Sequence, residues 1–217
     1  MAITYFFHIF PINSYIMKTY ICISLQIIMI SMDDVDKKII SFLQEDGRTS
    51  LSEIGRKLGL SHVSVRKRLK NLCESLVNVS ADLNAEQLDL RIAIVSAEVE
   101  THERLRELID IFSKCPRTVF VTTTTGAYNV MTIMVAEDAD TLNAILEVCS
   151  IRAQKGIRRS EAVIGEAPVV PKYLPIKIVP NKEMEIAPCG VNCGKCLRYK
   201  NQKCLGCPAT KYYRGPL

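Results

Sequence analysis

Residues 50–72 read SLSEIGRKLGLSHVSVRKRLKNL, and this stretch decides the fold expected for the front of the chain. Ser50 is followed three residues later by Glu53, the pattern of a capping box, and this predicts the start of a short helix. Gly59 then provides a tight turn, and Ser61 caps a further helix that runs to the end of the stretch. Two short helices joined by a glycine turn predict a helix-turn-helix.

A preceding helix is expected from Met32 onward. Apolar residues recur at three- and four-residue spacing between Val35 and Leu43, which is typical of a helix with one buried face. Acidic residues occupy its first turn, where the helix N-terminus favours negative charge: Asp33, Asp34 and Asp36. Asp46-Gly47 ends this helix. The three helices together predict a domain over residues 32–80.

The last of the three helices has two different faces. Val65, Leu69 and Leu72 share one side and form the expected buried stripe. The other side presents Val63, Ser64, Lys67, Lys70 and Asn71, flanked by His62, Arg66 and Arg68. Four cations and no acid lie between Ser61 and Leu72. Such a helix suits a DNA major groove, with N-terminal side chains at base edges and basic flanks at phosphates. The alternative is a three-helix domain with one basic, solvated face.

Residues 81–168 alternate between strand and helix patterns. Strands are predicted over 92–99, 118–125, 130–135 and 159–164. A helix follows the first strand, with Leu105, Leu108, Ile109 and Phe112 on one face, and a second helix follows the third strand, with Leu142, Ile145, Leu146 and Cys149 on one face. This βαββαβ order predicts a ferredoxin-like sandwich, so the overall fold class is α+β. No residue pattern in this domain indicates catalysis, and we do not expect an enzyme.

The C-terminal residues 189–217 concentrate five of the nine cysteines, in the order Cys189-x3-Cys193-x2-Cys196-x7-Cys204-x2-Cys207. Two pairs of cysteines, each pair with two residues between its members, can supply four thiolates to one tetrahedral zinc ion. The spacing of the first three also allows an iron–sulfur cluster, and a thiol–disulfide switch or no cofactor remain alternatives. Prolines recur through residues 169–188, which predicts a linker or an extended arm lying on the surface. The tail beyond it is expected to be a semi-independent metal-binding unit.

Two further features of the sequence have simpler interpretations. The scattered cysteines lie in apolar stretches and are expected to be small buried hydrophobic residues: Cys22, Cys73, Cys115 and Cys149.

Residues 1–31 are rich in isoleucine, but Pro11, Asn13 and Lys18 interrupt any membrane-spanning run. They lack a signal-peptide pattern. A mis-assigned start ahead of Met32, or a disordered leader, is the preferred interpretation, with an anchor or an extra folded element as alternatives.

Three segments resemble the Lrp/AsnC family of prokaryotic regulators: VDKKII from Val35, QEDGR from Gln44 and GLSHVSVRKRL from Gly59. The resemblance extends from about Met32 to Pro168. It implies that His62, Val63, Ser64 and Lys67 face bases, and that Ser61, Arg66, Arg68 and Lys70 face phosphates. It also implies that the middle domain forms dimers and higher assemblies. Small effectors, often amino acids, would bind between dimers near Gly126, Ala127, Tyr128 and Asn129.

The expected protein is therefore a cytoplasmic, homo-oligomeric transcription regulator that binds double-stranded DNA, not a membrane. The charge distribution agrees with this, because residues 32–80 hold nine basic against seven acidic side chains and residues 169–217 hold nine against two, whereas residues 81–168 are acidic. The competing hypothesis is an iron–sulfur electron carrier or enzyme subunit, whose helical region would bind another protein.

Overall fold

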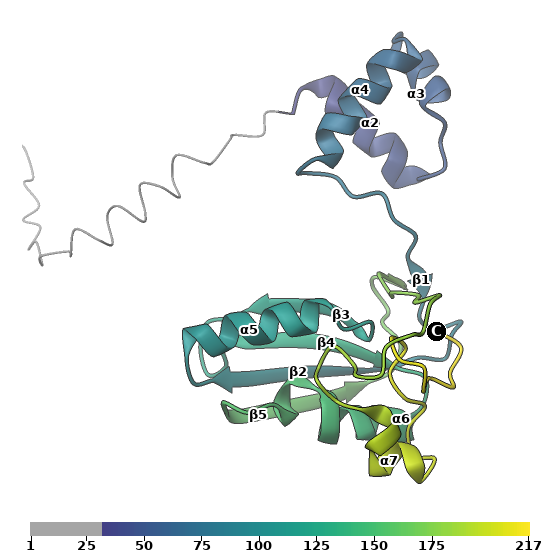
Figure 1. Cartoon of the computed structure of the whole chain (residues 1–217). Coiled ribbons are helices and arrows are strands. Elements are labelled where there is room, and N and C mark those ends of the chain that lie inside the picture. Colours follow the sequence, from purple (N-terminus) through teal and green to yellow (C-terminus); the bar gives the residue numbers. More distant parts are fainter. Residues whose placement is uncertain (1–31) are drawn as a thin grey trace, which may run out of the picture. The chain divides into compact units, whose positions relative to one another are not determined.

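The computed structural model describes residues 32–217, which form two compact units that divide after Val79 (Figure 1). The hypotheses about the leader concern residues 1–31, which lie outside the described residues. In the described part of the chain, no helix is long and apolar enough to cross a membrane.

The first unit contains the three predicted helices. Ile39, Ile54 and Val65 contribute one fully buried side chain from each helix, and partly buried apolar residues surround them. The helices are α2 (Asp34–Glu45), α3 (Leu51–Leu58) and α4 (His62–Cys73). The helix-turn-helix prediction is confirmed, because each of these helices has the apolar face that the core needs.

The N-terminal caps of the helices agree with the prediction, except that the capping box expected at the start of α3 is incomplete. Ser50 accepts a hydrogen bond from the Glu53 amide at 3.2 Å, but Glu53 forms an ion pair with Lys57. The reciprocal capping box forms instead at the start of α2, where the side chains and amides of Asp33 and Asp36 bond each other. Both caps satisfy amides that a helix start leaves without partners.

The second unit is built on a four-stranded antiparallel sheet with the strand order β3-β4-β2-β5. The strands are β2 (Arg91–Val99), β3 (Thr118–Thr123), β4 (Val130–Ala136) and β5 (Ile157–Gly165). Two helices pack on one face of this sheet (Figure 1), namely α5 (His102–Ser113) and α6 (Ala139–Ala144). The predicted βαββαβ order is therefore present, and Phe112 and Leu142 lie in the core between the layers.

The second predicted helix of this domain changes its hydrogen bonding part-way. After α6 the chain forms a π-helical turn, η1 (Ile145–Cys149), and then a 3-10 turn, η2 (Ile151–Ala153). The Ser150 amide bonds the Ile145 carbonyl at 2.7 Å. A π-turn of this kind inserts a residue into the helix and changes the direction of the side chains that follow.

Of the two structures expected for the proline-rich segment, a linker or an extended arm, the chain forms an extended arm that packs on the sheet unit. In residues 169–188, β6 (Tyr173–Leu174) pairs with β1 (Leu83–Asn84). Leu174 and Ile176 are buried in a second apolar cluster on the other face of the sheet, together with Ile92. An extended chain can bury alternate side chains although prolines exclude a helix, so the prolines did not indicate a free linker.

The cysteine-rich tail likewise belongs to the second unit. It contains η3 (Cys193–Lys195) and the short helix α7 (Leu197–Lys200), and it packs beside α6. Lys203 pairs with Asp140 at 2.9 Å, and the Leu205 amide bonds the Thr141 hydroxyl at 3.2 Å. Tyr213 and Leu217 complete the second apolar cluster. The tail is thus part of the sheet domain, which differs from the semi-independent module expected.

Candidate functional site

Helix α4 presents the surface that the sequence assigned to DNA. Val65 and Leu72 are buried and Leu69 is half-buried, as the predicted stripe requires. The side chains predicted to face bases are exposed: His62, Val63, Ser64 and Lys67. Val63 is 72% exposed and so is free to contact a partner.

Arg68 differs from the other basic residues of α4. Its Nη1 atom lies 2.7 Å from Asp33 and 2.8 Å from Asp36, so it joins α4 to the start of α2. The Asp36 amide and the Arg68 guanidinium hold the pKa of Asp33 below its ordinary value. By contrast, Arg66, Lys67 and Lys70 are exposed. Arg68 therefore links two helices of the unit, a structural role that the sequence did not indicate, and its expected phosphate contact stays a prediction.

Glycine at two positions permits the turn between α3 and α4. Gly59 ends α3 in the left-handed conformation, with φ of 68°, where a side chain would be strained. Gly55 lies one turn earlier, and a Cβ atom there would meet the Leu60 carbonyl oxygen at 2.6 Å. Gly59 was predicted from the sequence, whereas Gly55 was not, because the requirement for glycine there arises only from the close approach of the turn.

The sheet face opposite the helices carries a row of large apolar side chains. Phe120 pairs with Ile133, Ile133 with Ile94, and Ile94 with Val163, so the row crosses all four strands. Phe120, Ile94 and Val163 are 45%, 39% and 53% exposed. A row of this kind on a sheet is suited to contact with another protein surface.

The turn assigned to effector binding joins β3 to β4. Gly126 has φ of 112°, and the Asn129 side chain exchanges two hydrogen bonds with the backbone of Val99, at 2.8 and 2.9 Å. Arg159 donates to the Ala127 carbonyl at 2.9 Å and stacks over the Tyr128 ring. Asn129 is therefore committed to holding the turn, which accounts for its presence without a ligand.

Glu98 and Arg159 add charged groups beside this turn. Arg159 lies 2.7 Å from Glu98, which also pairs with Arg158. Both residues come from strands next to the turn, β2 and β5, and both remain partly accessible. Neither residue was predicted from the sequence, because their proximity depends on the pairing of β2 with β5.

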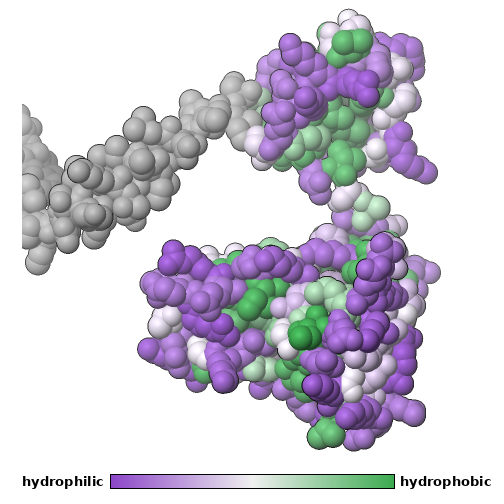
Figure 2. All heavy atoms as spheres, in the orientation of Figure 1, coloured by the Kyte–Doolittle hydropathy of each residue, from purple (hydrophilic) through white to green (hydrophobic). Residues whose placement is uncertain are grey.

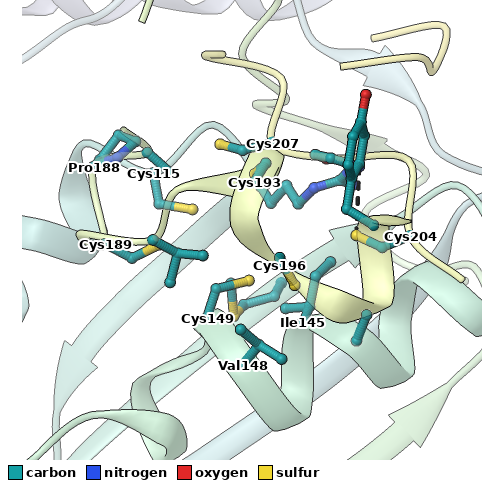
Figure 3. A pocket seen from close by; sticks show the side chains of 17 residues that line it. Cys115, Ile145, Val148, Cys149, Pro188, Cys189, Cys193, Cys196, Cys204 and Cys207 are labelled. Atoms are coloured by element: carbon teal, nitrogen blue, oxygen red, sulfur yellow. Dashed lines mark hydrogen bonds between the residues drawn. The ribbon is translucent and has the colours of Figure 1, made fainter. Parts of the chain in front are cut away.

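The tail cysteines line a single cavity of about 40 Å³, and two cysteines of the sheet domain line it with them (Figure 3). The seven are Cys115, Cys149, Cys189, Cys193, Cys196, Cys204 and Cys207. Cys115 is a buried member of the main apolar core and Cys149 packs against it, as predicted, and both also line this cavity. Cys73, predicted to be buried, is exposed on the first unit.

The protonation of these thiols depends on their burial and on each other. Burial raises the pKa of Cys207 to about 12 and also raises that of Cys193 and Cys204. The neighbouring Cys189 thiol and burial raise the pKa of Cys149, and Cys149 in turn lowers the pKa of Cys189 to about 7. Cys189 is therefore the thiol of this pair that ionises first. In the described residues, no three side chains of the metal-ligating types are close enough together to hold an ion.

A buried ion pair supports the wall of the cavity. Arg117 lies 2.5 Å from Glu137, and both side chains are almost completely buried. The Tyr213 hydroxyl also bonds Glu137, and Arg117 donates to the Gly206 carbonyl at 2.8 Å. Gly206 lies between Cys204 and Cys207. The pair therefore fixes this cysteine loop to the sheet.

Two parts of the chain match domains of a known protein family. Residues 32–72 match the AsnC-type helix-turn-helix domain, and residues 92–165 match the Lrp/AsnC ligand binding domain. The chain is 35% identical over 129 residues to the HTH-type transcriptional regulator FL11 of Pyrococcus furiosus, which covers 58% of this chain and 85% of that relative. The chain belongs to the Lrp/AsnC family of transcriptional regulators.

Further similarities agree with the Lrp/AsnC assignment. The HTH-type transcriptional regulator Ptr1 of Methanocaldococcus jannaschii is 28% identical, covering 53% of this chain and 79% of that relative. The structure of Escherichia coli AsnC superposes with a TM-score of 0.53 at 18% identity, covering 62% and 92% of the two chains. A Neisseria meningitidis transcriptional regulator in complex with L-Met gives a TM-score of 0.53 at 19% identity, covering 62% and 90%. These two structures share the fold.

The family match has two consequences for the chain. Its first unit is the DNA-binding domain of an Lrp/AsnC transcription regulator, and its sheet is the domain that in this family binds ligands. The matched ranges end at residue 165, so the cysteine tail lies beyond both. The buried Arg117–Glu137 pair and the cavity join this tail to the Lrp/AsnC domain, and neither was predicted. They arise from contacts between residues 20 to 89 positions apart.

Proposed function

We propose that this regulator reads specific double-stranded DNA in the cytoplasm with helix α4. The observation that carries the proposal is the exposed face of α4, which has basic side chains and no acidic residue from Ser61 to Cys73. Val63, Ser64 and Lys67 are the proposed base contacts, since they lie in the N-terminal half of the helix. Arg66 and Lys70 are the proposed phosphate contacts.

Selection of bound fragments from random DNA is the first experiment, because it supplies the operator. On that operator, Lys67→Ala should weaken binding by roughly 1–3 kcal/mol and relax the preference at one base position, as expected for loss of a base contact. Lys38→Ala is the matched control, because Lys38 is an exposed lysine that lies on α2 and not on α4. Equal effects of the two variants on affinity and on its salt dependence would refute the assignment of α4.

We also propose that two chains pair through the open face of the sheet. The apolar row of Phe120, Ile133, Ile94 and Val163 supports this, as does the need of a helix-turn-helix for a second half-site. Ile94→Glu places a charge at the centre of the row and should convert dimers or larger assemblies to monomers in light scattering. Ile178→Glu is the control, since Ile178 is also exposed but lies outside the four strands. An unchanged mass for Ile94→Glu would exclude this face.

The turn from Gly126 to Asn129 is the proposed effector site, and an amino acid is the proposed class of ligand. Glu98 and Arg159 support it, because together they offer a carboxylate and a guanidinium to a zwitterion. Thermal-shift measurements with the individual amino acids test this. A ligand should raise the melting temperature of the wild-type protein but not that of Glu98→Gln, while Glu103→Gln, on α5, should respond like the wild type. No shift with any amino acid would contradict the proposal.

The tail is the proposed metal-binding part, with zinc as the ion and an iron–sulfur cluster as the alternative. Thiols are the donors that both require, and Cys193, Cys196, Cys204 and Cys207 are the proposed zinc ligands, with Cys189 as an additional one. Metal content and the visible spectrum of the purified chain distinguish the two. Colourless protein with bound zinc favours the first, and brown protein with iron and sulfide favours the second. Protein that holds neither under reducing conditions would end the proposal.

A further inference from the structure

Apart from its cysteines, the tail has a strongly basic surface to which the proposed functions assign no role. Residues 189–217 contain six basic side chains and no acidic one, whereas residues 81–168 of the same unit contain nine basic and fourteen acidic ones. Figure 2 shows mostly hydrophilic side chains over the end of the sheet unit where α7 lies (Figure 1). A polyanion that approaches this unit is therefore attracted to the tail and repelled by the acidic residues that precede it.

An open groove of about 620 Å³ lies beside η3 and α7. Its polar lining consists of three cations and two side-chain amides: Lys195, Arg198, Lys203, Asn192 and Asn201. Among the described lining residues, none carries a carboxylate. Lysine, arginine and asparagine side chains donate hydrogen bonds, and proteins use these groups to contact DNA phosphates. The other lining side chains are three apolar ones and Cys196, which can lie against the sugars of a nucleic-acid strand.

The cations of this surface are accessible to a ligand. Lys195 and Lys200 are exposed, and neither forms an ion pair within residues 32–217. Arg198 pairs with Glu147, but these two side chains are 40% and 53% exposed. Exposed ion pairs are weak and are screened by salt, so a phosphate group can take the place of the carboxylate.

Arg214 is fixed beside α7 by an aromatic ring. Its guanidinium lies 4.1 Å from the centroid of the Tyr199 ring, and its Nη2 atom donates to the Tyr199 carbonyl at 3.0 Å. The Arg214 side chain is nevertheless exposed. An arginine that is held in this way loses less conformational freedom when its remaining N–H groups bind a phosphate. The tail therefore offers a preorganised guanidinium in addition to exposed lysines.

We infer that the basic tail surface, formed by Lys195, Arg198, Lys200, Lys203 and Arg214, binds the phosphate backbone of double-stranded DNA. The chain belongs to a family of DNA-binding regulators, so duplex DNA is the polyanion that it meets. Cations on a surface without acids contact phosphates whatever the base sequence. The inference rests on the proposed reading of DNA by α4 and adds to it a contact that does not depend on sequence.

DNA binding by the full chain at a series of salt concentrations tests the inference, with the selected operator and a duplex of scrambled sequence as probes. Lys195→Gln combined with Lys200→Gln should weaken binding to both duplexes alike. It should also lower the slope of log Kd against log salt concentration by about 2, since each phosphate contact contributes about 0.9. Arg152→Gln combined with Lys155→Gln is the matched control, because these two exposed cations of the same unit lie outside the tail and the groove.

A second variant tests the same surface by strengthening it, which a variant that fails to fold cannot imitate. Glu147→Gln removes the carboxylate that pairs with Arg198, so affinity for both duplexes should rise and the salt slope should increase by about 1. Glu103→Gln is its control, because it removes an exposed carboxylate that pairs with Arg106 on α5. A tail that only supports the fold predicts no gain of affinity for Glu147→Gln.

The two probes separate this inference from the proposed role of α4. If the double tail variant binds both duplexes like its control while Lys67→Ala weakens operator binding, the inference is overturned and the role of α4 stands. If the tail variant weakens binding to the operator alone, the tail contacts bases and the inference is wrong. If it weakens binding to both duplexes while Lys67→Ala has no effect, the inference stands without the proposed role of α4.

Discussion

At the scale of single residues, Gly55 has the least room for a side chain in the DNA-binding unit. Gly55→Ala brings Cβ within 2.6 Å of the Leu60 carbonyl oxygen, so α3 and the turn must separate. We expect the free energy of unfolding of this unit to fall by about 1–3 kcal/mol, as for other overpacked positions. Gly47→Ala is the control, because its nearest neighbour lies at 3.7 Å. Urea denaturation measures the stability of both variants. Equal stabilities would show that the turn can move enough to accommodate the added Cβ atom.

Glu137 is the residue on which the buried polar network depends. Glu137→Ala leaves Arg117 charged, buried and without its carboxylate, and we expect a loss of about 3–5 kcal/mol in the stability of the sheet unit. Glu107→Ala removes an exposed pair with Arg104 and should change stability by about 0–1 kcal/mol. Chemical denaturation of both variants is the measurement. A similar small effect of each would mean that water replaces the lost carboxylate.

At the scale of elements, Arg68 and Arg66 separate the two tasks of α4. Arg68→Met removes the link between α4 and α2, so the melting temperature of the helical unit should fall. Arg66→Met leaves that link intact and should lower affinity for all DNA sequences alike. Calorimetry and DNA binding together test the pair. If Arg68→Met melts like the wild type but binds DNA weakly, Arg68 contacts phosphate after all.

The ion pair between Arg68 and Asp33 predicts that the stability of the helical unit depends on pH in the acidic range. The pKa of Asp33 is lowered in the folded unit, so its contribution to stability is complete above the ordinary aspartate pKa of about 4 and is lost as the pH falls through the lowered value. Melting of the helical unit should therefore decline in this acidic window. In Arg68→Met the decline should be smaller, because one of the groups that lower the pKa of Asp33 is gone. Identical pH profiles would contradict this.

At the scale of the whole molecule, the tail completes the sheet unit. A chain ending at residue 188 loses Tyr213 and Leu217 from the second apolar cluster, and it also loses the Tyr213 hydroxyl that bonds Glu137 and the Lys203 ammonium that pairs with Asp140. We expect the transition of the sheet unit to move to lower temperature in calorimetry, while that of the helical unit stays in place. If the sheet transition does not move, the tail is an independent attachment, as its sequence suggested.

The sequence by itself determined the three helices, the βαββαβ order and the exposed face of α4, because each depends on signals within a few residues. Helical spacing, caps such as Ser61 and turns such as Gly59 involve residues close together in the chain, so they can be recognised from the sequence alone. Only the tertiary structure decided that residues 169–188 are packed, that Arg68 joins two helices and that Cys115 and Cys149 face the tail. These contacts connect positions far apart in the chain, and their energies depend on which surfaces meet when the sheet folds, which no local pattern specifies.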